Sequence, residues 1–289
     1  MRKKIAVILL VSCFLAIGSI AQTTLSDSNP TEITQDKKVK GFFFITPIYQ
    51  YSYFDNIELE SNTNYYTMPE GNSSDVFSEE DISEYNNQFG TSYNSSMLGL
   101  KIGYQVLDGL GISAYAGINH FNFESWKTED NEQSLVTEYP SLTMGVYVDY
   151  EIKVNSFLSA LTFLSYNYTT TRSVLVENKF SENVATSKIK TNSWEANIAM
   201  VYRAGKFLPY AGVGFAQCFL NTVIQEEIQF IDEEGQPFTE KIEFDSHFKG
   251  QAFYGLIGME YLFNKNFSVY TRVAFPNPAR LSLGIKFII

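Results

Sequence analysis

The chain has 289 residues, of which 45% are hydrophobic and 16% aromatic, and its formal net charge at pH 7 is −11. This acidic balance excludes a nucleic-acid-binding protein, which would need a basic face. The abundance of apolar residues excludes disorder over most of the chain. Beyond residue 21, no apolar run reaches the roughly 18–20 residues that a membrane-spanning helix requires.

The N-terminus has the pattern of a secretory signal peptide. Met1-Arg2-Lys3-Lys4 is basic, residues 5–17 are apolar, and small residues follow up to Ala21. Signal peptides combine these three features in this order. We therefore predict a signal peptide over residues 1–21, cleaved after Ala21, and a flexible periplasmic segment over residues 22–40.

The two cysteines bear on export and on packing. Leu10-Val11-Ser12-Cys13 matches a lipoprotein cleavage box, which is the alternative to cleavage after Ala21. Cleavage after Ala21 removes Cys13 and leaves Cys218 alone, so no intramolecular disulfide is expected. A single thiol in an apolar stretch is typical of a small packing residue.

From residue 41 onward, apolar and polar residues alternate with a period of two. Residues 98–106 are apolar at every even position, and residues 142–152, 194–202 and 283–289 repeat the pattern. Such alternation indicates strands with one apolar face. Ten segments are expected to form strands: 41–54, 93–107, 110–127, 139–153, 157–176, 188–203, 207–225, 248–263, 266–275 and 279–289.

The links between these segments alternate in length. Those at 108–109, 154–156, 204–206 and 264–266 are short, with hairpin-turn chemistry, whereas 55–92, 128–138, 177–187 and 226–247 are long and only 276–278 is short on that side. Short turns at one end and long loops at the other are typical of outer-membrane barrels. We therefore predict an all-β fold over residues 41–289. It is a transmembrane up-and-down antiparallel β-barrel in the cell outer membrane, with about ten strands (eight to twelve), short periplasmic turns and long extracellular loops.

Aromatic residues gather near strand ends, which favours a membrane barrel over a soluble β-sandwich. Tyr49, Tyr51 and Tyr53 lie near one strand end, and Phe121, Phe123 and Trp126 near another. Amphipathic rings favour the membrane–water interface, so we interpret both groups as parts of interfacial girdles. Two prolines, Pro47 and Pro209, are expected at strand ends or bulges, because proline cannot donate to a ladder.

The last eight residues fit the pattern polar-x-Gly-x-x-apolar-x-apolar. They are Ser282-Leu283-Gly284-Ile285-Lys286-Phe287-Ile288-Ile289. They resemble the signal that the barrel-assembly machinery reads on the last strand of outer-membrane proteins, with Ser282, Gly284, Phe287 and Ile289 at the key positions. Family members often end in Phe or Trp, whereas this chain ends in Ile289. Residues 41–289 resemble the porin-family (OmpA-like or PorT-like) outer-membrane β-barrels of Bacteroidota. The resemblance implies a fold, a membrane and the assembly machinery as a partner during insertion.

Acidic residues are concentrated in three of the predicted loops. Residues 54–92, 124–138 and 226–247 contain 22 of the 32 acids and only two bases, a net charge of −20. The loops are therefore interpreted as a solvated extracellular surface. The alternative is divalent-cation binding, either as bridges to lipopolysaccharide phosphates or as ordered Ca²⁺, because oxygen ligands suit these ions. Residues 228–244 are expected to form a projecting hairpin, and residues 81–85 a short helix.

A small set of charged residues has the inward parity of the predicted strands. Buried charges must be paired, and side chains usually fill the interior of a barrel with about ten strands. We therefore predict a lumen network of four acids and four bases that plugs the barrel, with a narrow pore for small solutes or ions as the alternative. The network consists of Lys101, Asp149, Glu151, Glu195, Arg203, Glu260, Arg272 and Lys286.

One motif points to catalysis. Asp245-Ser246-His247 resembles the Asp-x-His of the omptin proteases, but the second acidic pair of that family, Asp-x-Asp, has only Glu58-Leu59-Glu60 as its counterpart. The sequence has no Gly-x-Ser-x-Gly motif, phosphate-binding glycine loop or zinc-type Cys/His cluster. We expect a non-enzymatic protein without cofactor or metal, acting in surface interaction or envelope integrity. Outer-membrane lipid and lipopolysaccharide are the expected partners, with no nucleic acid and an unidentified extracellular ligand. An omptin-like rim protease is the second alternative, after the narrow pore.

Overall fold

The computed structural model describes residues 41–68, 71–88, 91–127, 132–137, 140–171, 174–178, 186–231 and 237–289. The predicted signal peptide and the segment 22–40 lie outside these ranges. Within them the protein is built almost entirely from antiparallel strands, with one helix, α2 (Glu79–Gln88). No helix of the described ranges has the length and hydropathy needed to cross a bilayer.

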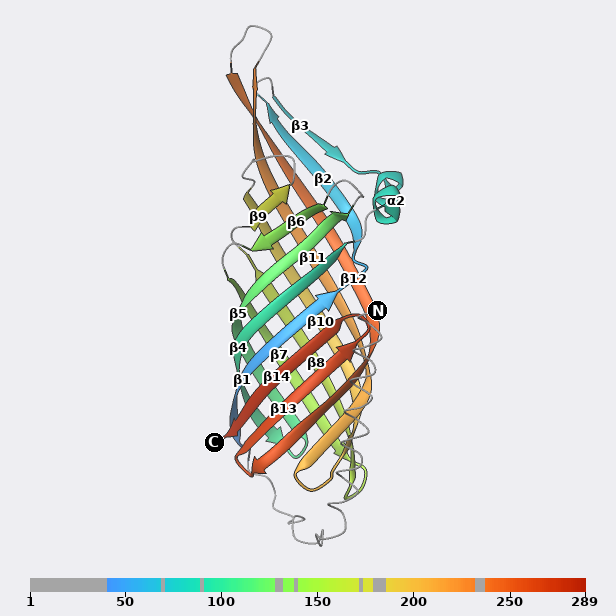
Figure 1. Cartoon of the computed structure of the whole chain (residues 1–289), viewed down its shortest axis with the longest axis vertical. Helices are drawn as coiled ribbons and strands as arrows, with labels where there is room; N and C mark the ends of the chain where they lie inside the picture. Colours follow the sequence, from blue (N-terminus) through green and yellow to red (C-terminus); the bar gives the residue numbers. More distant parts are fainter. Residues whose placement is uncertain are drawn as a thin grey trace.

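Ten strands close into a barrel, because β14 pairs back to β1 and β11 pairs with β12 (Figure 1). Around the barrel the order is β1, β4, β5, β7, β8, β10, β11, β12, β13 and β14. The predicted all-β barrel and its ten strands are thus confirmed. Their bounds are β1 Phe43–Phe54, β4 Ser92–Leu107, β5 Leu110–Lys127, β7 Ser141–Lys153, β8 Leu158–Thr170, β10 Thr186–Tyr202, β11 Phe207–Ile231, β12 Pro237–Asn264, β13 Phe267–Phe275 and β14 Ala279–Ile288.

The loop end of the barrel carries more structure than expected. β11 and β12 continue their pairing to Ile231 and Pro237, so the predicted hairpin is confirmed and projects well beyond the barrel (Figure 1). Helix α2 confirms the helix expected around residues 81–85. Four further strands extend the sheet without joining the ring: β2 Glu58–Met68, β3 Gly71–Val76, β6 Glu132–Thr137 and β9 Val174–Asn178. The first three lie in mostly polar segments that were expected to be loops. The strand expected over 157–176 is divided between β8 and β9.

The opposite end consists of short turns. Gly109 closes the β4–β5 turn at a φ of +87°, and a Cβ there would lie 2.2 Å from the Glu151 carbonyl oxygen, so only glycine fits. In the β7–β8 turn, the Asn155 side-chain oxygen accepts hydrogen bonds from the backbone N–H groups of Phe157 and Leu158. This type of side-chain bond favours Asn in turns.

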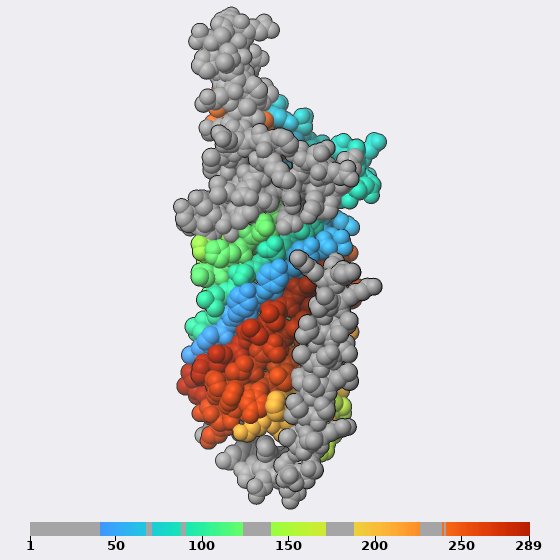
Figure 2. Space-filling model, in the orientation of Figure 1, coloured from blue at the N-terminus to red at the C-terminus, as the bar shows by residue number. Residues whose placement is uncertain are grey.

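The outer wall of the barrel is apolar, because large hydrophobic side chains are exposed along its strands. Figure 2 shows the strands of one side of the barrel lying next to one another as a continuous surface. At the turn end, Phe207, Tyr261, Phe263, Phe267 and Phe287 form a chain of rings with centroids 4.7–5.3 Å apart. Such a ring belt suits a membrane interface. The exposed apolar residues elsewhere on the wall include Leu98, Leu100, Ile102, Leu142, Met144, Val146, Val148, Ile198, Met200, Leu281, Leu283 and Ile285.

Three sequence expectations about single residues are wrong. Phe121 and Phe123 do not lie in a girdle but inside the barrel, at 2% and 1% exposure, because on β5 the even positions Ile112 and Ile118 face outward. Pro47 lies inside β1 with its register to β4 unbroken. The ladder to β14 is interrupted at residues 46 and 47, where proline has no N–H to donate. Pro209, as expected, lies near a strand end, at the third residue of β11.

Candidate functional site

The loop half of the barrel interior is filled by packed apolar side chains, which we call the apolar seal. Each of them is at most 8% exposed. Tyr93 stacks on Phe54 and on Phe121, with ring centroids 5.9 and 5.2 Å apart, and Phe123 meets the Phe248 ring edge-on at 5.1 Å. Apolar side chains dominate the lumen at this level, with the buried hydroxyl groups of Thr171 and Thr222 beside Ile189. Its residues are Phe54, Tyr93, Phe121, Phe123, Ile189, Leu220 and Phe248.

Cys218 is part of the same apolar cluster and is 1% exposed. Its neighbours on the cluster are aliphatic and aromatic, and it is a free thiol. The expected role of a small packing residue is therefore confirmed.

Helix α2 covers the seal from outside the barrel. Tyr85 is 5% exposed and its ring lies 6.3 Å from that of Phe248. Asn86 fixes the helix to β2, because its side chain accepts a hydrogen bond from the Leu59 N–H and donates one to the Leu59 carbonyl. The helix is thus a lid held by specific contacts, and burial raises the pKa of Tyr85 to about 12.

The start of α2 is built by its own sequence. Ser78 and Asp81 form a capping box, in which the Ser78 N–H donates to the Asp81 carboxylate at 2.8 Å and the Asp81 N–H donates to Ser78 Oγ at 3.2 Å. These hydrogen bonds hold the pKa of Asp81 below its usual range. The first turn contains the acidic residues Glu79, Glu80 and Asp81. Their negative charge interacts favourably with the positive end of the helix dipole and stabilises the helix.

Near the seal, the lumen contains one buried ion pair. Arg280 Nη1 lies 2.5 Å from Glu195 Oε1, with side-chain exposures of 10% and 2%. Tyr254 donates hydrogen bonds to Asn197 at 2.7 Å and to Glu195 at 3.4 Å. Arg280 Nε also donates to Ser52 Oγ at 3.0 Å. Both charges are therefore compensated inside the barrel.

The turn half of the lumen encloses a cavity of about 500 Å³, which we call the vestibule. Six cationic and four anionic side chains line it, a net charge of +2. The residues of two hairpin turns, Asp108-Gly109 and Asn264-Lys265, lie at its mouth. The vestibule therefore belongs to the periplasmic end. Its charged residues are Lys101, Asp108, Asp149, Glu151, Lys153, Arg203, Glu260, Lys265, Arg272 and Lys286.

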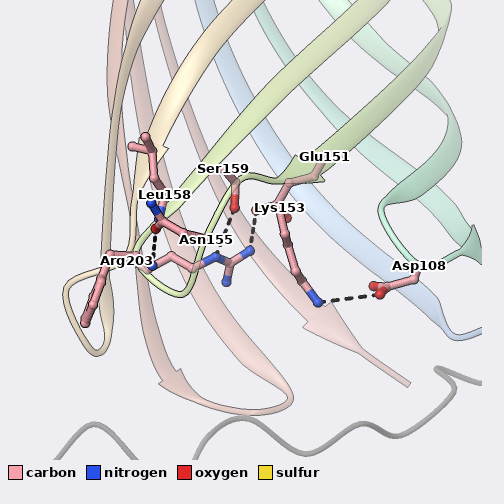
Figure 3. Close-up of polar contacts among 8 residues, drawn as sticks. Asp108, Glu151, Lys153, Asn155, Leu158, Ser159 and Arg203 are labelled. Carbon is pink, nitrogen blue, oxygen red and sulfur yellow. Dashed lines mark hydrogen bonds and ion pairs between the residues drawn. The ribbon is translucent and has the colours of Figure 1, made fainter.

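Two ion pairs close part of the vestibule rim (Figure 3). Arg203 pairs with Glu151, and its Nε donates to Ser159 Oγ at 3.2 Å. Lys153 lies 3.5 Å from Asp108, but both side chains are more than 60% exposed. The first pair is a fixed part of the wall, while the second lies in solvent.

Three vestibule cations are held by aromatic rings instead of carboxylates. Lys101 Nζ lies 4.4 Å from the Tyr147 ring centroid, and Lys286 Nζ lies 4.8 Å from that of Phe44. The Arg272 guanidinium lies 4.1 Å from the Phe163 ring centroid. Arg272 also donates hydrogen bonds to the hydroxyl groups of Tyr147 and Tyr210, at 3.1 and 3.3 Å.

The eight residues proposed as a lumen network thus lie in two places. Seven line the vestibule, and Glu195 lies apart, near the seal. Among these eight residues, all within the described ranges, Arg203–Glu151 is the one ion pair in contact. Sequence reasoning missed Arg280, the partner of Glu195. Its parity on the last strand, shared with Ser282 and Lys286, was the signal that would have found it.

The residues of the predicted assembly signal lie on β14, the strand that closes the barrel against β1. Gly284 has a structural reason: a Cβ there would lie 2.4 Å from the Tyr270 ring, which fills the lumen beside it. Ser282 faces the vestibule, and Phe287 belongs to the outer ring belt. Ile289 is exposed, and its N–H donates to the Phe43 carbonyl.

The residues of the protease alternative lie on neighbouring strands at the loop end. His247 Nε2 is 3.5 Å from Asp245 Oδ1 on β12, and β2 pairs beside them with Glu58 opposite Lys249. Glu60 lies 3.2 Å from Lys249 Nζ, so its carboxylate is engaged in an ion pair. Among the described residues, no three His, Cys, Asp or Glu side chains are grouped to hold a metal ion.

Comparison of the sequence with protein-family models and with curated proteins gives no match. Many solved structures are similar, among them the following three. The outer membrane protease OmpT of Escherichia coli is 8% identical over 90% of this chain and 100% of that chain, with a TM-score of 0.44. The translocator domain of the autotransporter NalP of Neisseria meningitidis is 7% identical over 93% and 97%, with a TM-score of 0.40.

The third, OprG of Pseudomonas aeruginosa, is 10% identical over 87% of this chain and 97% of that chain, with a TM-score of 0.35. Likenesses of this size carry no information on function. The closed antiparallel ring, the apolar outer wall and the two unequal ends nevertheless give this chain the architecture of an outer-membrane β-barrel protein.

Proposed function

We propose that this protein is an outer-membrane barrel that acts through its extracellular acidic surface, without enzymatic activity and without transporting solutes through its lumen. The apolar seal is the single observation that carries this proposal. A pore needs a polar path, whereas Phe123, Leu220 and Phe248 fill the loop half of the lumen and α2 covers it. The narrow-pore alternative would require these groups to move aside.

The segment above the seal that contains β2, β3 and α2 has one sign of charge. Residues 54–88 contain no Lys or Arg. Seven described carboxylates there are exposed, on β2, β3 and α2, and the β11–β12 hairpin extends beside them (Figure 1). A rigid anionic platform attracts cationic partners or divalent ions that bridge to lipopolysaccharide phosphates. The exposed carboxylates are Glu58, Glu60, Asp75, Glu79, Glu80, Asp81 and Glu84.

The proposal includes export of the chain and its insertion into the outer membrane. The N-terminal pattern supports a signal peptide over residues 1–21 that sends the chain to the outer membrane. The C-terminal pattern supports insertion by the barrel-assembly machinery and membership of the porin-type barrels of Bacteroidota. Lipid and lipopolysaccharide are then the molecules that surround the apolar wall.

The surface role is tested with the protein in lipid nanodiscs and an oligolysine peptide as the cationic probe. The platform variant carries Asp75→Asn, Glu79→Gln and Glu80→Gln, which are exposed. The matched control is Asp149→Asn, a carboxylate of the vestibule. We expect the platform variant to bind the probe more weakly and to lose part of the salt dependence, with the control unchanged. Equal binding by the platform variant and the wild type would contradict the proposal.

A rim protease is a second candidate, because Asp245 and His247 are in contact and an acidic residue, Glu60, lies on the neighbouring strand. Against it stands the pairing of Glu60 with Lys249. Incubation of the protein with a peptide library decides between the candidates. Cleavage that disappears in the His247→Ala variant would replace the non-enzymatic proposal.

A further inference from the structure

The vestibule has the dimensions of a small-molecule site. Its volume, about 500 Å³, falls within the roughly 300–1,000 Å³ that ligand pockets occupy. Apolar side chains close it on the loop side, and turn residues lie at its mouth. Any molecule that enters must come from the periplasmic end, so this cavity stands apart from the extracellular role proposed above.

The charge of the vestibule is unbalanced. Two of its carboxylates are engaged in ion pairs, Glu151 with Arg203 and Asp108 with Lys153. Of the other two, Glu260 accepts a hydrogen bond from Ser268 at 2.6 Å, and Asp149 interacts at longer range with Lys101. Against these two stand four cations outside any ion pair among the described residues: Lys101, Lys265, Arg272 and Lys286.

Three of these cations have inner positions and incomplete compensation. Lys101 interacts with the like charges of Arg272 and Lys286 as well as with the carboxylates of Asp149 and Glu260. Each of the three cations lies over an aromatic ring. A cation–π contact restores only part of the hydration that an ion loses when it is buried. An anion among the three cations would supply the missing compensation.

The aromatic lining of the vestibule determines which organic group the anion can carry. Phe44, Tyr147, Phe163 and Tyr270 line the vestibule. Two of these rings lie against glycines: a Cβ at Gly103 would be 2.1 Å from the Phe44 ring, and one at Gly284 would be 2.4 Å from the Tyr270 ring. The rings therefore pack directly on the backbone of the neighbouring strands and offer flat apolar surfaces beside the cations. Planar organic groups pack well against such surfaces.

From this combination we propose that the vestibule is a binding site for a small organic anion with a planar or aromatic body and a phosphate or carboxylate group. Lys101, Lys286 and Arg272 bind the anionic group, and the aromatic walls contact the body. The ligand enters from the periplasmic end and does not pass the apolar seal.

Isothermal titration calorimetry tests the site, using the folded protein in detergent micelles and phenyl phosphate as the probe. Phenol supplies the body without the charge, and inorganic phosphate supplies the charge without the body. We expect saturable binding of phenyl phosphate, with one site per barrel, and weaker binding of both controls. If inorganic phosphate bound as tightly as phenyl phosphate, the assignment to an organic anion would be wrong.

The test variant is Lys101→Met with Lys286→Met, and Lys153→Met is the matched control. Lys153 lines the same cavity but is 62% exposed and paired with Asp108. Hydrogen bonds to charged groups contribute about 1.5–3 kcal/mol, so the double variant should bind about ten- to a hundred-fold more weakly. The control should bind as the wild type does.

Folding of each variant is checked by circular dichroism. If the double variant does not fold, Lys286→Gln alone serves instead, with a smaller expected loss. No saturable binding by the wild type, or equal loss in the Lys153→Met control, would overturn the proposal.

Discussion

The buried ion pair between Glu195 and Arg280 gives the sharpest test of how the interior is built. The two charges are 2.5 Å apart and almost fully enclosed. Replacing one partner leaves the other as a buried charge without its counter-ion. Glu195 alone would keep the hydrogen bond from the Tyr254 hydroxyl at 3.4 Å, and Arg280 alone would keep its hydrogen bond to Ser52 at 3.0 Å. Breaking a buried pair in this way costs about 3–5 kcal/mol.

Replacing both partners removes both desolvation penalties. We therefore expect Arg280→Met and Glu195→Met each to lower the free energy of unfolding by about 3–5 kcal/mol. The double variant should lie close to the wild type. The assay is urea-induced unfolding in phospholipid vesicles, followed by tryptophan fluorescence, in a double-mutant cycle.

The Lys153–Asp108 pair is the control for this cycle. Its atoms are 3.5 Å apart, but the side chains are 62% and 68% exposed, so the same cycle should give a coupling of at most about 1 kcal/mol. The reasoning is refuted if the double Met variant costs the sum of the two single variants. The reasoning is also refuted if the coupling energy of Glu195–Arg280 is as small as that of the exposed pair.

Three further predictions concern packing, pH and reactivity. Gly284→Ala should slow barrel assembly and destabilise the barrel by about 1–3 kcal/mol, because its Cβ would meet the Tyr270 ring at 2.4 Å. Gly255→Ala is the control and should be tolerated, because its Cβ would lie 3.6 Å from Phe275. Heat-dependent gel mobility measures the stability of both variants. Because burial raises the pKa of Tyr85 to about 12, its contribution to docking of α2 is fully present below about pH 10, the pKa of an unperturbed tyrosine. It should be lost as the pH rises through 12. Hydrogen exchange of α2 measures this loss, and Tyr85→Phe should abolish the pH dependence; an α2 that opens at the same pH in both proteins would contradict it. Cys218, 1% exposed, should resist maleimide in the folded protein and react after unfolding, and rapid labelling of the native barrel would show that the apolar cluster opens.

The ten strands of the barrel could be predicted from the sequence, because the alternation of apolar and polar residues along a strand is a local signal. The outward positions of β4, β7, β10 and β14 follow directly from the parity of their apolar residues. The strands β2, β3 and β6 escaped because their mostly polar segments have no sustained alternation, and residues such as Asn62 and Asn64 on β2 are ladder partners that no periodicity marks.

The site was harder to predict, because parity says which face a residue takes but not its depth in the barrel. Parity placed Glu195 and Lys101 on the inner face, yet the first lies beside the seal and the second in the vestibule. The same rule, applied to β5, would have placed Phe121 and Phe123 inside. Aromatic residues near strand ends suggested a girdle instead, and the seal was missed for that reason.

Conductance in planar lipid bilayers tests the central claim most directly, namely that apolar side chains close the lumen. We predict no steady channel current from the wild-type barrel at neutral pH. A variant with Phe123→Ser and Phe248→Ser, which removes two rings of the seal, should show current steps. Steady open-channel current from the wild type, unchanged by these two substitutions, would contradict the account.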